Sequence, residues 1–521
     1  MTLGPLMQVV AQSYPADLLA KKKLNFFAPS RTHAVALAQF IKQSKQPVAV
    51  IVASGNHAAK LSESLSELVP KLELIEFPSW ETLPHERLSP AAETVGKRLK
   101  ALHRMLEIQN GVDHPVALLI SIRAALQPVM GGLEDHPPFT LTRGNDYLLP
   151  ELSLKLIELA YERVDMVSRR GEFAIRGGIL DVFPTTASHA LRLEFFGDQL
   201  EDIREFNVSD QRSIASQLDS VDLYAARELI ITPSVSQRAR EMAGEFPGLN
   251  EMLSKIGEGI PVSGMESLAP LLGVKLGPIT DYLKKTAVVV LEPERIMARA
   301  QSLVDTNEEF LHAAWDAAIE GATAPIDFSK GGFYEPETFF DLIRKDHSII
   351  EIDSLQKADA VDLGLRQIPS FTRESPAVGW LQDQQSQGMR IVIVARGHGT
   401  AERIVEILSG EQLPVVLTEV LGDPASEHIT CVVGNLDSGF VMQDQKLIVL
   451  SETEFFGVSG AYASPKERKL ARRRGQQVDP LALKAGDYVV HEIHGIGRFK
   501  ELIQRQNRNQ VREYLLIEYA P

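Results

Sequence analysis

The sequence predicts a multidomain α/β protein, and three observations lead to this fold class. The chain has 521 residues, enough for about three to five domains at roughly 100–200 residues each. Hydrophobic residues amount to 44% and charged residues to 24%, as in ordinary globular proteins. Residues 1–133 alternate short apolar runs with helical spacing, a pattern typical of a parallel sheet covered by helices on both faces.

The composition excludes several classes of protein. No apolar run approaches the about 20 residues of a membrane span, and no basic segment leads into an apolar core at the N-terminus, so we expect neither a membrane protein nor a secreted one. The single cysteine, Cys431, cannot form an internal disulfide, which is typical of the cytoplasm. Asp and Glu number 69 against 54 Lys and Arg, a net charge of −15. Any DNA contact should therefore be local.

The first segment, residues 1–133, is expected to form most of the parallel sheet. A nucleotide-binding domain of this kind needs Gly-x-x-x-x-Gly-Lys-Ser/Thr, in which amides and a lysine hold the phosphates. Residues 28–33 follow the first strand with neither glycine nor lysine, and residues 54–57 follow the second without lysine. We therefore predict a fold of the P-loop kind with a degenerate nucleotide site. The expected strands are 24–27, 48–53, 74–77 and 116–121, and the expected helices are 33–41, 58–68 and 93–105.

The second segment, residues 134–228, has the pattern of a small β-rich domain. Its apolar and polar residues alternate between glycine and proline turns, as in half-buried antiparallel strands. Period-two alternation places Arg192 and Phe196 on the face opposite to Leu191 and Leu193. Two interpretations stay open: an exposed aromatic beside an arginine forms a protein interface, or this face is a second small core over which Arg192 extends.

The remaining chain divides into three parts. Residues 345–457 contain expected strands at 391–395, 415–418 and 447–451, with no catalytic constellation. Residues 458–480 form a linker with six positive charges within 466–474, either a DNA or acidic-partner contact or a solvated helix. From residue 481 a β-rich unit begins, and its histidines at 491 and 494 lack the spacing and third ligand of a zinc site.

Residues 169–184 and 191–198 carry the sequences RRGEFAIRGGILDVFP and LRLEFFGD. Both stretches resemble the excision-repair subunit UvrB. They resemble even more closely the UvrB-like N-terminal half of the Mfd family, the bacterial transcription-repair coupling factors. Residues 77–90, 397–403 and 487–499 resemble the first, third and RNA polymerase-interacting domains of that family. The resemblance covers nearly the whole chain.

The resemblance implies a division into domains. Residues 1–133 and 229–344 would form one UvrB-like α/β domain, split by a UvrA-binding insert at 134–228. A third α/β domain (345–457), a basic linker (458–480) and the start of a small RNA polymerase-interacting β-barrel (481–521) would follow. The residues that the resemblance assigns to UvrA are Arg176, Arg192 and Phe196. The strand we assign to the RNA polymerase β subunit carries Tyr514, Leu515, Leu516 and Ile517.

The resemblance also implies what the chain does. Leu291 stands where UvrB carries its magnesium-binding aspartate, so with the missing lysine we expect no ATP binding, no cofactor, no metal and no catalytic residue in this chain. The family's ATP- and magnesium-dependent DNA translocase motor would follow the last strand. The implied function is transcription-coupled nucleotide excision repair, in which this part recruits UvrA to RNA polymerase stalled at DNA lesions. The alternative is a UvrB-like subunit that binds damaged DNA directly, although the first domain lacks a tyrosine-rich hairpin.

Overall fold

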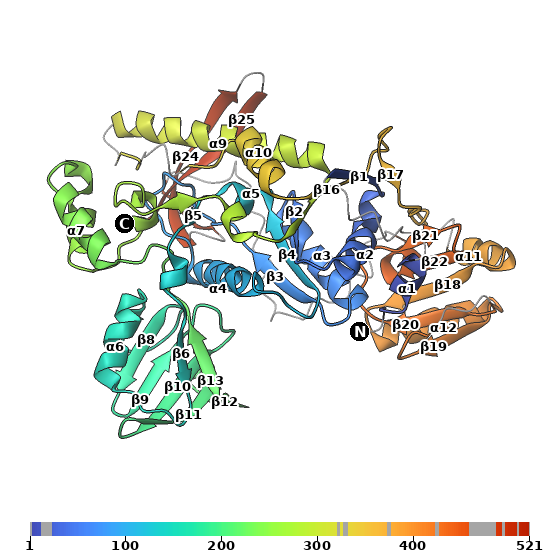
Figure 1. The fold of residues 1–521 in the computed structure, drawn as a ribbon, viewed down its shortest axis with the longest axis horizontal. Helices are drawn as coiled ribbons and strands as arrows, with labels where there is room; N and C mark the ends of the chain where they lie inside the picture. The colour runs from blue at the N-terminus through green and yellow to red at the C-terminus, as the bar shows by residue number, and fades with distance from the viewer. Residues whose placement is uncertain are drawn as a thin grey trace. The chain divides into compact units, whose positions relative to one another are not determined.

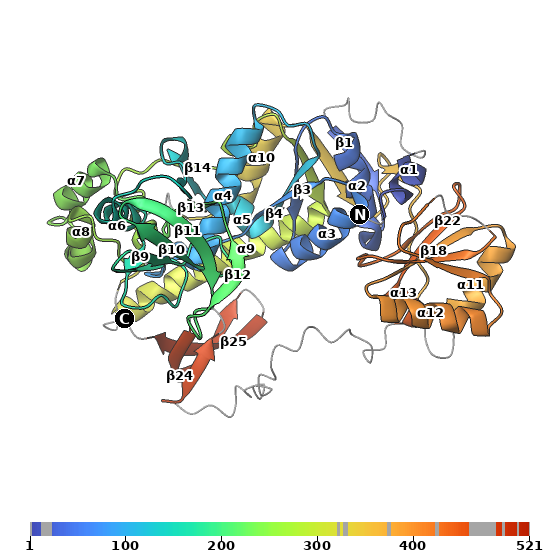
Figure 2. The ribbon, with the colours of Figure 1, turned by 90° about the horizontal axis from the view of Figure 1, so that it is seen from below.

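The computed structural model divides into two compact units, Met1–Val458 and Ser459–Pro521 (Figures 1 and 2). It describes residues 3–11, 23–319, 324–326, 332–371, 377–422, 427–457, 486–491, 495–507 and 510–519. Parallel and mixed sheets with helices make up the first unit, so the predicted α/β fold class is confirmed. In the described part of the chain, every helix is too short or too polar to cross a membrane.

A seven-stranded sheet with all its strands parallel forms the centre of the first unit. Val50 and Val52 pack into one core under helices α2 (His33–Gln43) and α3 (Gly55–Leu68), whereas Ile51 packs into the core under α4 (Ala92–Ile108). This alternation explains why β2 reads as a continuous apolar run. The strands are, in spatial order, β17 (Val361–Asp362), β1 (Lys23–Phe27), β16 (Ile349–Asp353), β15 (Ala287–Leu291), β2 (Val48–Val52), β4 (Val116–Ser121) and β3 (Glu73–Phe77).

The sheet extends further along the chain than the sequence analysis placed it. Strand β16 pairs with β1 and β15, and β17 pairs with β1, whereas we assigned residues from 345 onward to the third domain. The physical reason is the run Ile-Ile-Glu-Ile-Asp, which is buried on both sides and follows helix α10 (Pro336–Asp346). Helix α9 (Pro293–Ile319) follows β15. The segment between 229 and 286 adds a helical subcluster with α7 (Pro233–Met242) and α8 (Asn250–Gly257).

The insert between β4 and β15 forms a separate sheet, as the alternation predicted (Figure 1). One face of this sheet packs against α6 (Leu149–Glu158) through Leu152, Leu156, Leu191 and Leu193. Its six strands are β12 (Ser213–Gln217), β11 (Gln199–Phe206), β10 (Ala190–Phe196), β9 (Ile179–Val182), β8 (Glu172–Arg176) and β7 (Glu162–Arg163), and β6 (Phe139–Thr142) pairs with β13 (Ser220–Leu223) beside it.

A buried ion pair anchors the end of the insert to the sheet domain. Arg98 of α4 donates from Nε to Glu228 at 2.8 Å, and neither side chain is more than 1% exposed. The Arg98 guanidinium also lies over the rings of Phe77 and Trp80, 4.3 and 5.4 Å from their centroids. Since a buried charge is costly without a partner, this pair fixes the chain where it leaves the insert.

The third sheet packs between its own helices and the N-terminal helix. Ile391 and Ile393 face α11 (Ala377–Ser386), α12 (His398–Gly410) and α13 (Glu452–Phe456), whereas Val392 and Val394 join the core that includes α1 (Leu6–Ala11). The spatial order of its strands is β19 (Val415–Thr418), β20 (Ile429–Val433), β18 (Arg390–Ala395), β22 (Leu447–Ser451) and β21 (Phe440–Met442).

The second unit is an open three-stranded antiparallel sheet over its described residues. Strand β24 (Gly495–Asn507) lies between β23 (Tyr488–His491) and β25 (Gln510–Tyr519). The sequence analysis expected the start of a small barrel here, and the described strands do not close one. The basic run at 466–474 lies outside the described residues.

Candidate protein-docking sites

The two hairpin tips of the insert bring the predicted UvrA-binding residues together. Gly177 and Gly197 form the turns with positive φ of 59° and 61°, a conformation that glycine adopts without strain. Glu194 of β10 pairs with Ile179 of β9, and the Phe195 amide donates to the Gly178 carbonyl at 2.8 Å. The two turns therefore lie next to each other at one end of the sheet.

Phe196 is the most exposed large apolar residue of the insert. It ends strand β10 with 77% of its surface exposed, whereas Leu191 and Leu193 on the opposite face are fully buried. Strand alternation and pairing place Phe196 on the same face as Ile179, which is 37% exposed. The sequence analysis did not single out Ile179, although its alternation with the buried Leu180 and Val182 would have placed it on this face.

Arg192 lies on the same face, but it is not a free surface arginine. Its Nε and Nη2 donate to the two carboxylate oxygens of Asp181 at 2.7 and 2.9 Å, and its guanidinium lies 4.8 Å from the ring centroid of the buried Phe206. Only 22% of its side chain is exposed, and the hydrogen bonds that it donates to Asp181 raise the pKa of Arg192 further. The sequence analysis expected a partly exposed Arg192 and left open a second small core beneath it. Phe206 belongs to such a separate buried cluster, whereas the ion pair with Asp181, eleven positions away in the sequence, was not expected.

Arg176 occupies the neighbouring tip and faces solvent. It ends strand β8, is exposed, and donates from Nη2 to the carbonyl oxygen of Asp165. Its strand partner is Ile179. We define the tip face by Arg176, Ile179, Arg192 and Phe196: an exposed aromatic and an aliphatic residue flanked by two arginines, the composition typical of an interface hot spot.

The loops in which the sequence analysis expected a degenerate nucleotide site lie at the carboxyl end of the seven-stranded sheet. Leu291, where the resemblance implies a metal-binding aspartate, is 1% exposed and packs into the core. The next residue, Glu292, has a φ of +52°. Its Oε1 accepts hydrogen bonds from Ser30 Oγ at 2.6 Å and Ser354 Oγ at 3.1 Å, and its Oε2 accepts one from Arg295 at 3.0 Å. The Glu292 carboxylate thus links the end of β15 to the loop after β1, in which the sequence analysis looked for a phosphate-binding loop.

The electrostatics of this region favour a closed internal network. Burial acts to raise the pKa of Glu292, but the hydrogen bond from Ser30 and the nearby His33, Ser354 and Arg295 outweigh it and lower the pKa. Burial lowers the pKa of His33 to about 4, and its Nε2 lies 3.0 Å from the Ala28 carbonyl. A fixed carboxylate repels phosphate. The sequence analysis missed Glu292, whose signal was its place directly after the strand.

The C-terminal sheet places the predicted polymerase-binding residues on an edge strand. Strand β25 pairs with β24 alone among the described strands, with Tyr514 opposite Ile503. Leu515 is 41% and Leu516 44% exposed, whereas Ile517 is half-buried opposite the buried Phe499. Adjacent exposed leucines point to opposite faces of a strand, so both faces carry apolar surface.

In the described part of the chain, no group of three or more His, Cys, Asp or Glu has the arrangement to hold a metal ion.

The third sheet places its Gly397-His398-Gly399 turn at the start of α12, where Gly397 is the N-cap. Arg396 next to it donates its amide to Glu452 at 2.9 Å. This turn is accounted for as a strand-to-helix connection.

Comparison with known families finds matches to three parts of the chain. Residues 139–229 match the UvrB interaction domain, residues 384–455 match the MFD D3 domain, and residues 483–521 match the CarD-like/TRCF RID domain. These matches define a modular protein in which a UvrB-type interaction domain is carried by an α/β scaffold.

Relatives along nearly the whole chain name the particular family. A transcription-repair-coupling factor of Mycobacterium bovis is 37% identical over 96% of this chain and 42% of its own length. Those of Haemophilus influenzae and Bacillus subtilis are 26% and 25% identical over 94% and 92% of this chain. The resemblance to the transcription-repair-coupling factors is therefore confirmed, and the chain spans about two fifths of the length of these relatives.

Proposed function

We propose that this chain is the docking part of a transcription-coupled nucleotide excision repair factor: it recruits UvrA through the insert and binds the RNA polymerase β subunit through the C-terminal sheet. The observation that carries the proposal is the 77% exposed Phe196 on the tip face, inside the segment that matches the UvrB interaction domain. An aromatic side chain so exposed on a well-packed domain costs solubility without a partner to cover it.

The residues of the tip face have different roles in this proposal. Phe196 and Ile179 supply the apolar contact, and Arg176 supplies an exposed charge. Arg192 is a positioning residue, because its guanidinium is held by Asp181 and Phe206 and keeps β9 and β10 in register beneath Phe196. A charged partner atom would reach Arg192 only through its remaining exposed part.

The experiment is a titration of the chain with UvrA of the same organism by calorimetry. Replacing Phe196 with alanine should weaken binding by about 1–3 kcal/mol, the size of an interface hot spot. The control is Val420→Ala. Val420 is also an exposed apolar residue, at 73%, but it follows β19 of the third sheet and lies outside the insert. Unchanged affinity in the Phe196 variant, or an equal loss in the control, would rule out the tip face.

Strand β25 supports the second contact. An edge strand presents unpaired backbone groups with which a partner strand can pair, and Leu515 and Leu516 add exposed apolar surface. Leu516→Arg should therefore abolish binding to RNA polymerase and leave UvrA binding unchanged. Tyr488→Arg is the matched control, because Tyr488 is 78% exposed on β23 at the opposite edge of the sheet. Polymerase binding that survives Leu516→Arg would exclude strand pairing at β25.

We further propose that this chain neither binds nor hydrolyses ATP. The translocase activity belongs to the part of such a factor that this chain does not cover. Two features support this proposal: Glu292 accepts a hydrogen bond from Ser30 in the loop after β1, and the buried Leu291 lies where the resemblance expects a magnesium-binding aspartate. Calorimetry with ATP and magnesium should show no saturable heat. Tight, magnesium-dependent binding would overturn this part of the proposal.

A further inference from the structure

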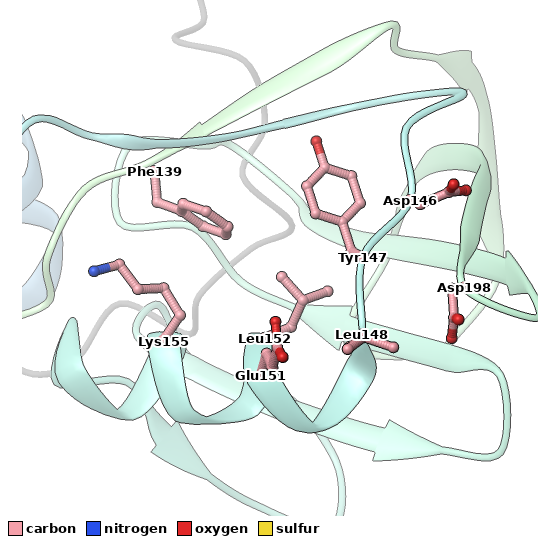
Figure 3. Close-up of a pocket in the computed structure, with 8 residues that line it drawn as sticks. All are labelled: Phe139, Asp146, Tyr147, Leu148, Glu151, Leu152, Lys155 and Asp198. Carbon is pink, nitrogen blue, oxygen red and sulfur yellow. The ribbon is translucent and has the colours of Figure 1, made fainter.

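A groove lies on the α6 side of the insert, next to the tip of the β10–β11 hairpin (Figure 3). Its volume is about 450 Å³. The rings of Phe139 and Tyr147 border one hollow above α6, with Lys155 at one side and Asp146 and Asp198 at the other. The lining residues are Phe139, Asp146, Tyr147, Leu148, Glu151, Leu152, Lys155 and Asp198.

The groove combines an apolar floor with an acidic rim. Leu152 is buried below it, and Leu148 at its edge is 46% exposed. Asp146, Glu151 and Asp198 are exposed, and their carboxylates make no hydrogen bond or ion pair within the described chain. The one lysine is already neutralised, because Lys155 Nζ lies 3.0 Å from Glu158. The groove therefore keeps an uncompensated negative charge beside aromatic rings.

The groove and the tip face lie on opposite sides of the insert sheet and meet at the β10–β11 turn. Asp198 belongs to the two-residue turn that follows Phe196, and its carbonyl accepts a hydrogen bond from the Tyr147 amide at 2.7 Å. Asn145 accepts another from the Leu200 amide at 3.0 Å. A partner that covers Phe196 at the end of the hairpin therefore lies one turn away from Asp198 on the acidic rim.

We propose that this groove binds a basic and apolar segment of the same partner, a lysine or arginine next to a large apolar side chain. The inference rests on the proposed function, since it names the chemistry of the segment that docks beside Phe196. A cation above the Tyr147 and Phe139 rings gains from their π faces, and the three carboxylates complement its charge. The neighbouring apolar side chain covers Leu148.

The test is calorimetric titration of UvrA into the variant Asp146→Asn/Glu151→Gln/Asp198→Asn. These carboxylates are exposed and stabilise no described contact, so the thermal unfolding midpoint should not change. Binding should weaken about tenfold, and the dependence of affinity on salt concentration should become shallower, because charge pairs at an interface are screened by salt. Hydrogen exchange should show residues 146–155 protected by UvrA in the parent chain and less so in the variant.

A matched control removes the same number of charges elsewhere. Glu245, Glu258 and Glu337 are exposed outside the insert, and their replacement by glutamine should leave both affinity and salt dependence unchanged. An equal loss in this control would show a general effect of net charge and would overturn the groove.

The outcome separates the two proposals. If Phe196→Ala weakens UvrA binding while the triple groove variant binds like the parent, the groove inference is wrong and the proposed function stands. If Phe196→Ala itself has no effect, the proposed interface is wrong. Weakening by both, with protection of residues 146–155, supports the groove.

Discussion

At the carboxyl end of strand β15 the polar side chains bind one another, whereas at the tip of the β10–β11 hairpin an aromatic ring is left uncovered. Glu292 is 8% exposed and has three hydrogen-bond donors from three different elements. Phe196 is 77% exposed, so most of its ring is not covered by the insert. Exposed apolar surface marks interaction sites, so the comparison favours the hairpin tip, and not the carboxyl end of β15, as the binding site.

The largest expected effect on the free energy of unfolding comes from pH and tests the closed network at β15. Burial lowers the pKa of His33 from 6.5 to about 4, so between these values the unfolded chain binds a proton that the folded chain does not. Stability should fall as the pH drops through this window, by about 3 kcal/mol at its end, since one pKa unit is worth roughly 1.4 kcal/mol. Urea unfolding at several pH values measures it.

The variant His33→Gln provides the control for that measurement. It should reduce the dependence of stability on pH between the two values, leaving the contributions of His57 and His103, whose pKa values burial also lowers and which act in the same direction. A pH dependence equal to that of the parent chain would mean that His33 is not part of a closed network.

A second, smaller effect is expected for Glu292→Ala. The change leaves Ser30, Ser354 and Arg295 without their shared acceptor, which should cost about 1–3 kcal/mol of stability. ATP binding should still be absent, because no lysine or aspartate is gained. The measurement is urea unfolding followed by calorimetry with ATP, and Glu294→Ala on the exposed side of the same helix start is the control. ATP binding by the variant would show that the carboxylate alone blocked an otherwise complete site.

Arg192 combines features of both regions, because it lies on the tip face and yet contacts Asp181 and Phe206 within the insert. Arg192→Ala should lower stability by about 1–2 kcal/mol, since Asp181, 7% exposed, loses its charged donor. Asp181→Asn should lower stability and UvrA affinity in the same proportion if Arg192 acts by positioning. A double-mutant cycle tests this, because the two losses should then not add. If Arg192→Ala weakens binding while Asp181→Asn leaves it intact, Arg192 contacts the partner directly.

The smallest effect on stability is expected for Phe196→Ala. The ring buries little within the insert, so unfolding in urea should change by less than about 0.5 kcal/mol, although UvrA binding should change most here. Phe195→Ala is the contrast, because Phe195 belongs to the partly buried residues packed on the α6 side, and its loss should destabilise the insert. A destabilised Phe196 variant would mean that this residue is part of a core.

Much of this contrast was predictable from sequence because it depends on local periodicity. The alternation of residues 190–196 placed Phe196 outward and Leu193 inward, and the apolar run of β2 indicated a strand covered on both faces. What failed depends on contacts between distant residues. The partner of Arg192 lies on another strand, the donors to Glu292 come from residues 262 and 62 positions away, and β16 joins a sheet whose neighbour β1 lies more than 300 residues earlier.

The assignments of Arg176, Arg192 and Phe196 to UvrA, and of strand β25 to RNA polymerase, stay predictions with a firmer geometric basis. Leu515 and Leu516 proved exposed on an edge strand, as the pattern of the last strand suggested. Ile179 could have been placed on the tip face by its alternation with Leu180 and Val182. The acidic groove could not have been predicted, because a hollow between α6 and a hairpin has no periodic signature.

The carboxylate of Glu292 is a ligand that is covalently attached to its own site. Enzymes that run on nucleotides alternate between shapes because the ligand arrives, changes and leaves, and each state favours a different arrangement. A tethered carboxylate cannot leave, so under the proposal that this chain binds no ATP we expect the sheet to keep one arrangement. Under that proposal the seven-stranded sheet acts as a rigid support, and we expect any nucleotide-driven movement of this chain to be powered from outside it.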